Sequence, residues 1–326
     1  MIIDHQSHWY PRTFIESLGG DGPLPRAAIT DGLVSYEAVE GDTWRMPAHF
    51  CDLDAFLEDM AANGVGGSVV SPNTPGQVDG VEAARARGVC EELNEAIAAA
   101  QREHPDKLIG LAMLPMQDPD AAIAVLDRGI GELDLRGVCL LSNIAGAPVV
   151  SAETEPVFAR VEELGVPLFL HPSHNSIAYK ALTLREVEIG LAWMFDTAAA
   201  AEAMIFSGLL DRLPGLTVVH PHLGGVLPYV VGRAEEMLNF NKSAIELPIR
   251  DYLKRNFYVD CVGSTPQALP VALDIYGEDR VLFASDYPWM PRKMALDFVA
   301  DNLTEELADK VLHRNRVPGI ELPGAS

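Results

Sequence analysis

The feature that most constrains the fold is a regular alternation of short apolar runs with longer helical segments. Eight runs are predicted as β-strands: Met1–Ile3, Gly67–Val70, Leu108–Leu114, Gly137–Leu141, Pro167–Leu170, Leu216–Val219, Asn256–Asp260 and Arg280–Ala284. Continuous apolar runs are typical of parallel strands that are covered on both faces. Helical periodicity occupies Leu53–Asn63, Val81–Glu103, Pro119–Gly131, Glu153–Leu164, Leu184–Leu213 and Thr265–Tyr276. Eight βα units in roughly 300 residues predict an α/β fold built as one (β/α)₈ barrel.

The same pattern predicts a single barrel domain over residues 1–326, because no linker or composition break separates two halves of a doubly wound fold. One interval differs, since residues 12–50 carry five Gly and three Pro. Alternation around Val34–Val39 and Thr43–Met46 predicts a small hairpin inserted after the first strand, where a barrel has its catalytic end. We expect residues 318–326 to form an irregular tail.

The charge balance excludes some partners. The chain has 24 Lys and Arg against 47 Asp and Glu, a formal net charge of −23. This balance argues against nucleic acids and anionic membranes, which bind clustered cations. The sequence has no run of 18 apolar residues and no signal-peptide pattern at its start, so we expect no membrane span. The four cysteines form no CxxC pair, which favours reduced thiols in a cytoplasmic protein: Cys51, Cys90, Cys139 and Cys261.

Histidines gather where predicted strands end. Three close pairs follow the first, fifth and sixth runs: His5 and His8, His171 and His174, His220 and His222. The eighth run leads into SDYP, which contains Asp286. Because barrel active sites are built at the carboxyl ends of the strands, we expect these side chains to converge. Imidazole and carboxylate ligands suit Zn, Fe or Mn, so the groups predict a metal site rather than scattered structural histidines.

Strand periodicity helps to choose within the first pair. Successive side chains of a strand point to opposite faces, so Asp4, Gln6 and His8 share one face and His5 points the other way. If His8 points into the mouth of the barrel, its neighbour there is Gln6.

Several stretches resemble the amidohydrolase-related (amidohydrolase 2) family of metal-dependent decarboxylases. They are IDHQSHWYP, GLAMLPMQDPDAAIAVLDRG, ELGVPLFLHPSHN, residues 190–233 with HPHLGGVLP, and VLFASDYPW. Within the family, the likeness is to aminocarboxymuconate-semialdehyde, dihydroxybenzoate and 5-carboxyvanillate decarboxylases. The resemblance implies a distorted (β/α)₈ barrel of the metal-dependent hydrolase superfamily, one divalent metal ion and often a homodimer. Zn is the expected metal, with Mn as the alternative.

The resemblance also implies roles for individual residues. His8, His171 and Asp286 match metal ligands, and Gln6 stands where the family has His or Glu. His222 matches an acid–base or water-activating histidine. His222, Asp286 or a water on the metal would then carry the proton in catalysis.

The departure at Gln6 leaves several interpretations open. An amide oxygen is a neutral and weaker ligand than imidazole or carboxylate. Gln6 could ligate the metal, or it could only form hydrogen bonds and leave His8, His171 and Asp286 as three ligands, which is enough for a catalytic metal. The metal could also be lost, or His5 could replace Gln6 if the strand has a bulge.

Aromatic and cationic residues are candidates for substrate contact. Trp193 matches a tryptophan that lines the substrate pocket in the resembling enzymes. Trp9, Tyr10 and Trp289 would form an aromatic wall or belong to the core. Arg45, on the predicted hairpin, is a candidate partner for a second anionic group of the substrate, with a surface arginine as the alternative.

Three functions remain under consideration. The leading hypothesis is nonoxidative decarboxylation of a small unsaturated or phenolic carboxylic acid, in which a metal orients the acid and stabilises negative charge. The same ligands would serve a hydrolase that cleaves a C–N, lactone or C–C bond. The third hypothesis is a non-catalytic barrel with a degraded metal site, which would act as a binding or scaffold protein. The expected partners are a small anionic organic substrate and a second copy of the chain, with no nucleic acid or membrane.

Overall fold

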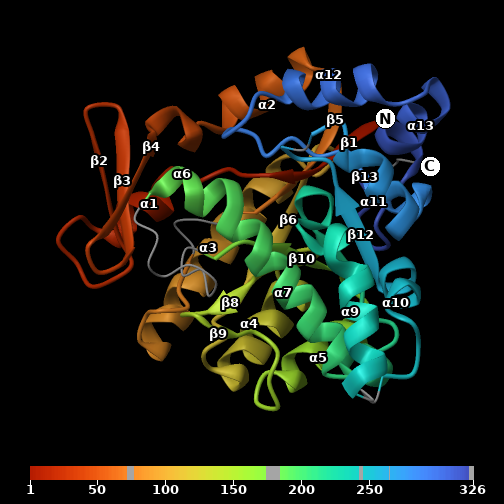
Figure 1. Ribbon diagram of the computed structural model, residues 1–326. Helices are drawn as coiled ribbons and strands as arrows, with labels where there is room; N and C mark the ends of the chain where they lie inside the picture. Colours follow the sequence, from red (N-terminus) through yellow and green to blue (C-terminus); the bar gives the residue numbers. More distant parts are fainter. Residues whose placement is uncertain (72–76, 174–183, 242–244, 264, 323–326) are drawn as a thin grey trace. The chain divides into compact units, whose positions relative to one another are not determined.

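The computed structural model describes residues 1–71, 77–173, 184–241, 245–263 and 265–322 (Figure 1). Its main sheet has eight strands, in the order β1-β5-β6-β7-β10-β11-β12-β13. The strands span Ile2–Ser7, Val65–Val70, Leu108–Met113, Gly137–Leu141, Leu168–His171, Val218–His220, Phe257–Asp260 and Val281–Leu282. The strands pair in parallel and in chain order, which confirms the predicted α/β fold of the (β/α)₈ class.

Helices follow most of the strands, as the periodicity predicts. The α-helices are α1 Arg12–Leu18, α2 Leu53–Ala62, α3 Ala83–Glu103, α4 Pro119–Gly131, α5 Glu155–Leu164, α6 Arg185–Val187, α7 Trp193–Phe206, α8 Leu209–Arg212, α9 Leu227–Asn241, α10 Ile249–Asn256, α11 Ala268–Tyr276, α12 Arg292–Asn302 and α13 Glu305–Asp309. Short 3₁₀ or π turns complete the set: Ala48–Cys51, Glu188–Ala192, His222–Gly224, Glu278–Arg280 and Lys310–Arg314. Side chains fix several helix starts, for example Asp52, which accepts a hydrogen bond from the Ala55 amide at the start of α2.

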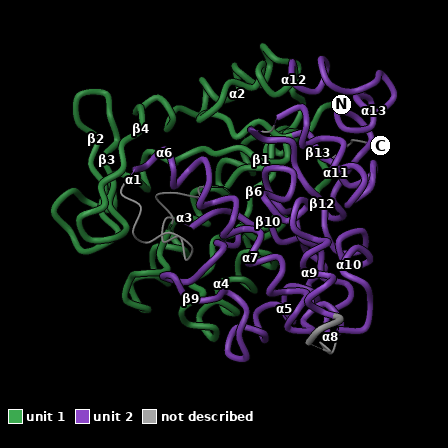
Figure 2. The backbone as a smooth tube through the Cα atoms, in the orientation of Figure 1, with its two compact units in different colours: residues 1–139, 284–296, 320–326 green, residues 140–283, 297–319 purple. Residues whose placement is uncertain are grey.

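Two compact units share the chain (Figure 2). The first comprises Met1–Cys139, Ala284–Leu296 and Ile320–Ser326, and the second comprises Leu140–Phe283 and Asp297–Gly319. The prediction of one domain stays a prediction. Buried apolar residues occur in both units. In the first, β6 can approach α3 closely because Gly110 has no side chain: a Cβ there would lie 2.6 Å from Ile97.

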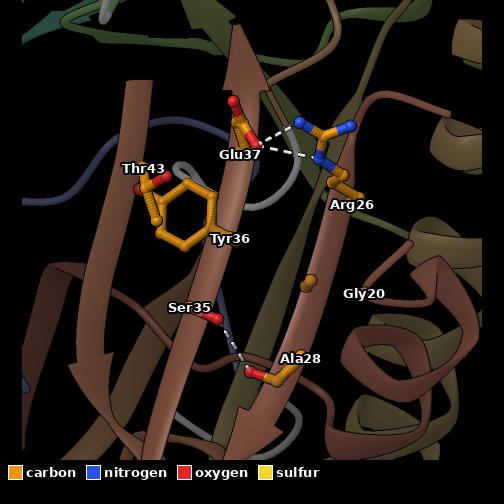
Figure 3. Close-up of a pocket in the computed structure, with 8 residues that line it drawn as sticks. Gly20, Arg26, Ala28, Ser35, Tyr36, Glu37 and Thr43 are labelled. Carbon is orange, nitrogen blue, oxygen red and sulfur yellow. Dashed lines mark hydrogen bonds and ion pairs between the residues drawn. The ribbon is translucent and has the colours of Figure 1, made fainter. Parts of the chain in front are cut away.

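The insertion after β1 is a three-stranded antiparallel sheet, of which the predicted hairpin is only a part. β3 (Leu33–Val39) and β4 (Asp42–Pro47) form the hairpin, and β2 (Arg26–Thr30) adds to β3. Val34, Tyr36 and Ala38 alternate inward on β3, which the sequence pattern indicates. Beside β2 lies a hollow of about 170 Å³, bordered by the ion pair of Arg26 with Glu37 (Figure 3). The sequence missed β2 because its run RAAIT is short and lacks alternation.

One helical run qualifies as a membrane span by length and composition. It extends from Arg185 to Phe206 and includes α6, the following π turn and α7. The sequence predicts a helix over Leu184–Leu213 but no membrane span there, because charged residues interrupt the apolar run. In the structure this run contains the buried Asp196, which accepts a hydrogen bond from Asn143, so α7 packs as a helix of the second unit.

The predicted irregular tail has no helix or strand in its described part, up to residue 322. It nevertheless contributes to the core, since Ile320 and Leu322 are buried. Leu322 fills the space beside Gly67, where a Cβ would lie 2.4 Å from it.

Candidate functional site

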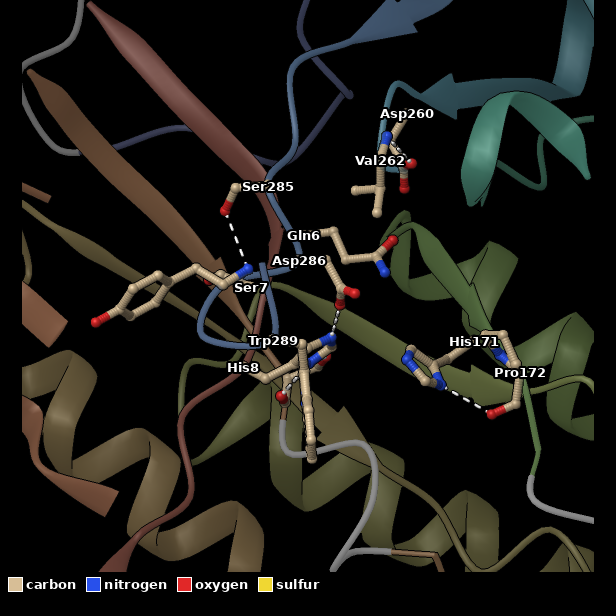
Figure 4. Close-up of polar contacts among 12 residues, drawn as sticks. Gln6, Ser7, His8, His171, Pro172, Asp260, Val262, Ser285, Asp286 and Trp289 are labelled. Carbon is tan, nitrogen blue, oxygen red and sulfur yellow. Dashed lines mark hydrogen bonds and ion pairs between the residues drawn. The ribbon is translucent and has the colours of Figure 1, made fainter. Parts of the chain in front are cut away.

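The end of β1 is joined to the segment that follows β13. The Asp286 amide donates to the Gln6 carbonyl at 2.9 Å, and the His8 amide donates to the Tyr287 carbonyl at 2.7 Å. These two bonds continue the parallel pairing beyond the last strand residues. They place the side chains of Gln6, His8 and Asp286 next to one another within the first unit (Figure 4).

His8 and Asp286 form the closest polar contact of this group. The His8 Nε2 atom lies 2.9 Å from Asp286 Oδ1. On its other side the ring Nδ1 lies 2.9 Å from the Ser71 carbonyl oxygen and 3.1 Å from the Ser71 hydroxyl. If Nδ1 donates to that carbonyl, Nε2 of a neutral ring presents a lone pair to the carboxylate; if Nδ1 accepts from the hydroxyl, Nε2 donates to Asp286. In the first tautomer Nε2 and Oδ1 are two acceptors that a bound cation would share.

Gln6 adds a polar group that lacks a partner. Its side chain is 8% exposed, and its Nε2 atom has no hydrogen-bond partner among the described residues. A buried N–H donor without an acceptor is costly, so an oxygen of a ligand beside Gln6 would remove that cost. The amide oxygen of Gln6 is the atom that would bind a divalent cation together with His8 and Asp286.

The pairing of β1 is irregular at this point. Asp4 pairs with Ser68 and Ser7 with Val70, so β1 has one residue more than β5 between these positions. Strict alternation from Asp4 to His8, the basis for preferring Gln6 to His5, does not hold across this bulge. His5 is fully buried, and the choice between the two residues stays a prediction.

A buried network lies beneath the pair. Asp4 accepts from the Ser285 amide at 2.9 Å, from the Ser285 hydroxyl and from Arg292 Nε at 3.1 Å. Burial raises the pKa of Asp4, while Arg292 and the Ser285 bonds oppose that shift. Sequence reasoning placed Asp4 on a strand face and Ser285 in the SDYP motif, but it assigned no role to Ser285 or Arg292, because a Ser and an Arg after a strand are typical of a surface loop.

In the second unit, His171 is the last residue of β10. Its Nδ1 lies 2.8 Å from the Pro172 carbonyl oxygen, so Nδ1 carries the proton and Nε2 is the nitrogen with the lone pair (Figure 4). The Ser142 amide donates to the His171 carbonyl, and the Ser173 amide donates to the Ser142 hydroxyl. These bonds fix the backbone on both sides of the ring. His174 lies outside the described residues.

His222 stands in a tight turn after β11. Its amide donates to Asp260 Oδ1 at 2.8 Å, and that oxygen also accepts from the Val262 amide. The four residues from His222 to Gly225 all have positive φ, between +53° and +82°. Such a run is strained for the non-glycine residues, so the surrounding packing must hold it. Sequence reasoning missed Asp260, although it ends a predicted strand.

The two glycines of this turn permit close packing. A Cβ at Gly224 would lie 2.3 Å from the Tyr276 hydroxyl, and a Cβ at Gly225 would lie 2.5 Å from the Met194 carbonyl of α7. The backbone of the segment HLGG, residues 222–225, therefore requires glycine at positions 224 and 225.

His220 has a different environment from His222. It is fully buried, and neither ring nitrogen has a hydrogen-bond partner among the described residues. Its ring lies 6.5 Å from that of Phe257. Burial, with a smaller contribution from His222, lowers the pKa of His220 to about 3, so the ring is neutral at pH 7.

The aromatic candidates divide between the two units. In the first, the Trp289 indole donates to the Tyr10 hydroxyl at 2.7 Å and packs edge-on against Phe50, which sequence reasoning did not select. Trp9 is buried and donates to the Cys51 carbonyl. Trp193 begins α7 in the second unit and is half-buried.

Arg45 lies on β4 between the buried Trp44 and Met46, and its side chain is exposed. Within the part of the chain that the structure describes, no three His, Cys, Asp or Glu side chains gather as a ready metal site. The structure brings His8 and Asp286 together and places Gln6 beside them, while the complete ligand set stays a prediction.

Comparisons with known proteins identify the family. The model of the family described as Amidohydrolase matches residues 3–315. The 2-amino-3-carboxymuconate-6-semialdehyde decarboxylase of Dictyostelium discoideum is 34% identical over 209 residues, 62% of this chain and 56% of that protein's length. The gamma-resorcylate decarboxylase of Rhizobium radiobacter is 30% identical over 84% of this chain and 88% of that enzyme.

A solved structure shows the same fold. It is the dihydroxybenzoic acid decarboxylase of Polaromonas sp. JS666 with bound manganese and the inhibitor 2-nitroresorcinol, and it matches with a TM-score of 0.75 at 23% identity over 98% of each chain. Since the family model extends over nearly the whole sequence, the chain belongs to the amidohydrolase family.

Proposed function

We propose that this protein is a metal-dependent, nonoxidative decarboxylase of a small phenolic or unsaturated carboxylic acid. The relatives described above are carboxy-lyases that act on such acids, and one of them aligns with most of this chain. The observation that carries the proposal is the contact of His8 Nε2 with Asp286 Oδ1, which lie 2.9 Å apart.

The proposed ligands are His8, Asp286 and His171, with Gln6 as a fourth oxygen donor. In both histidines Nδ1 lies within hydrogen-bond distance of a backbone carbonyl, an arrangement that commonly orients an imidazole toward a metal. A divalent ion held there would orient the substrate carboxylate and stabilise developing negative charge. Mn²⁺ is favoured by the Polaromonas neighbour, whose structure contains manganese, and Zn²⁺ suits the same ligands.

The chain itself must handle one proton. Loss of CO₂ leaves the electron pair of the broken C–C bond on the substrate carbon, and that carbon takes up one proton. His222 is the proposed donor, with Asp286 as the alternative, because its turn is held rigidly by Asp260 and by packing at Gly224 and Gly225. A positioned general acid contributes on the order of 10²–10⁴-fold to a rate.

Aromatic side chains would hold the ring of the substrate. The Trp289 indole N–H already donates to Tyr10, so these two residues offer mainly their ring surfaces. Trp193 is proposed as a further ring contact, and Arg45 as the partner of a second anionic group. We further propose that the protein forms a homodimer in the cytoplasm and has no nucleic acid or membrane partner.

Release of CO₂ tests the function directly. We would incubate the purified protein, loaded with Mn²⁺ or Zn²⁺, with carboxyl-labelled hydroxybenzoic and muconic acids and collect labelled gas. We expect CO₂ and the matching decarboxylated product from at least one acid, and much less from Asp286→Asn. A hydrolase would cleave esters, lactones or amides without gas, and turnover of those substrates alone would overturn the proposal.

A further inference from the structure

Arg292, the first residue of α12, is a charged side chain with no exposed surface. Its Nε lies 3.1 Å from Asp4 Oδ2, and its Nη1 lies 2.7 Å from Asp59 Oδ1. A third bond runs from Nη2 to the Ser68 hydroxyl at 3.4 Å. Burying a guanidinium is costly unless it is fully paired, so this position has a specific demand for arginine.

The guanidinium also contacts two aromatic rings, which pack edge-on against each other. Its central carbon is 4.0 Å from the centre of the Tyr287 ring and 4.4 Å from that of Phe56. Phe56 and Asp59 both belong to α2, and they present one ring face and one carboxylate to the arginine. A cation on an aromatic face is attracted by the ring, and more strongly when both are removed from water.

These contacts all act on the segment that carries Asp286. Tyr287 follows Asp286 and stacks on Arg292, and Ser285 precedes it and shares Asp4 with Arg292. The Ser285 hydroxyl reaches Asp4 and also accepts from the Tyr287 amide at 3.1 Å. The backbone on both sides of Asp286 is therefore tied to one buried cation.

We propose that Arg292 is a positioning residue, which holds residues 285–287 against β1 so that the Asp286 carboxylate stands beside His8. This inference rests on the proposed function, since it assigns Arg292 to the same pair of ligands. Asp286 itself has a φ of +61°, an uncommon conformation for a residue other than glycine, and the contacts of its neighbours help to hold it. Arg292 touches neither ligand, so its effect passes through Ser285, Tyr287 and Asp4.

Metal affinity is the first test. Arg292→Lys keeps the charge but loses the fork that bridges Asp4 and Asp59, and Arg292→Met removes the charge. We expect Mn²⁺ binding, followed by electron paramagnetic resonance, to weaken roughly tenfold in Arg292→Lys and further in Arg292→Met, as outer-shell changes at metal sites do. The matched control is Leu93→Ala, which opens a cavity in α3 of the same unit, outside this network. It should lose stability while keeping its Mn²⁺ affinity.

A metal-free measurement separates this inference from the proposed function. In histidine-labelled apoprotein, the His8 ring nitrogens give NMR signals that report the contact of Nε2 with Asp286. We expect those signals to shift in Arg292→Lys and to stay in place in Leu93→Ala. Unchanged His8 signals in Arg292→Lys would overturn the positioning role. So would an Mn²⁺ affinity of Arg292→Lys equal to that of a wild-type protein that binds Mn²⁺. A wild-type protein without Mn²⁺ affinity would overturn the proposed function and leave the NMR result to decide on Arg292.

Discussion

The Nε2 atom of His8 and the Oδ1 atom of Asp286 lie 2.9 Å apart, and the opposite ring nitrogen of His8 lies 2.9 Å from the Ser71 carbonyl oxygen. When that nitrogen donates its proton to the carbonyl, Nε2 and Oδ1 together are complementary to a positive charge. The backbone on each side is pinned: the Asp286 amide bonds to Gln6 and the His8 amide to Tyr287. The two acceptors are thus held together by bonds that do not depend on a ligand.

Asp286→Asn tests this pair. Asparagine keeps the shape of the side chain and can donate to His8, but it removes the charge that a divalent cation needs. We expect Mn²⁺ affinity to fall more than about 100-fold, beyond the range typical of outer-shell changes, with loss of turnover. Isothermal titration of the apoprotein measures the affinity. Affinity close to that of the wild type would remove Asp286 from the ligand set.

His222→Asn tests the proton donor. The substitution leaves the proposed ligands in place, so metal content should stay the same. Turnover should fall on the order of 10²–10⁴-fold, and the pH profile of kcat should lose one limb. A variant that keeps its turnover, or one that also loses its metal, would contradict the assignment of His222 as an acid rather than a ligand.

Gln6→Glu tests whether Gln6 faces the metal. A carboxylate in place of the amide adds a negative charge to an oxygen ligand, which Mn²⁺ favours. If Gln6 ligates the ion, Mn²⁺ affinity should rise by roughly tenfold, or about 1.4 kcal/mol. Gln6→Leu is the matched opposite change and should weaken binding. Equal affinity in all three proteins would show that Gln6 does not contact the metal.

His220 makes stability depend on pH. Its pKa is lowered from 6.5 to about 3 in the folded protein, so below pH 6.5 the unfolded chain binds a proton that the folded chain does not. Stability therefore falls with pH between about 6.5 and 3, by about 1.4 kcal/mol per pH unit from this group alone.

His220→Phe should remove that contribution, so urea unfolding of the variant should lose less stability between pH 7 and pH 5 than the wild type. The control is His313→Phe, which replaces an exposed imidazole and should leave the pH dependence unchanged. An identical pH dependence in wild type and His220→Phe would refute the buried, neutral state of His220.

The close packing of Gly224 against Tyr276 predicts that substitutions at these two residues have coupled effects on stability. Gly224→Ala would place a methyl group 2.3 Å from the Tyr276 hydroxyl, at a φ of +82°, and should destabilise the protein by about 1–3 kcal/mol. The Tyr276 hydroxyl is buried with no partner among the described residues, so Tyr276→Phe alone should be nearly neutral. Combined with Gly224→Ala it should recover part of the loss in thermal unfolding, and simple additivity of the two changes would contradict the contact.

Much of the fold follows from the apolar pattern, because a strand covered on both faces must be apolar along its length. Predicted and observed strands agree within a few residues, and α4 and β7 match their predicted limits. Among the eight strands of the main sheet, the largest error is at β1, which continues to Ser7. The last four residues of β1 are polar and end the apolar run, so the pattern did not predict them as strand. Polar residues are expected there, because active sites of barrels are built at the carboxyl ends of the strands.

Only part of the candidate functional site could be predicted from the sequence. His8 and Asp286 could be predicted because strand ends converge and the family motif marks them. Arg292 could not, because a charged residue in a helix start is normally exposed, and its burial depends on partners about 230 and 290 residues away in the sequence. The bulge between Asp4 and Ser7 was equally hidden, since it depends on the register of β5.

Elemental analysis of the purified protein beside Asp286→Asn tests the central claim most directly. The account predicts about one divalent ion per wild-type chain, Mn or Zn, and almost none in the variant. A wild-type protein that takes up no divalent metal, or a variant that keeps a full complement, would contradict it.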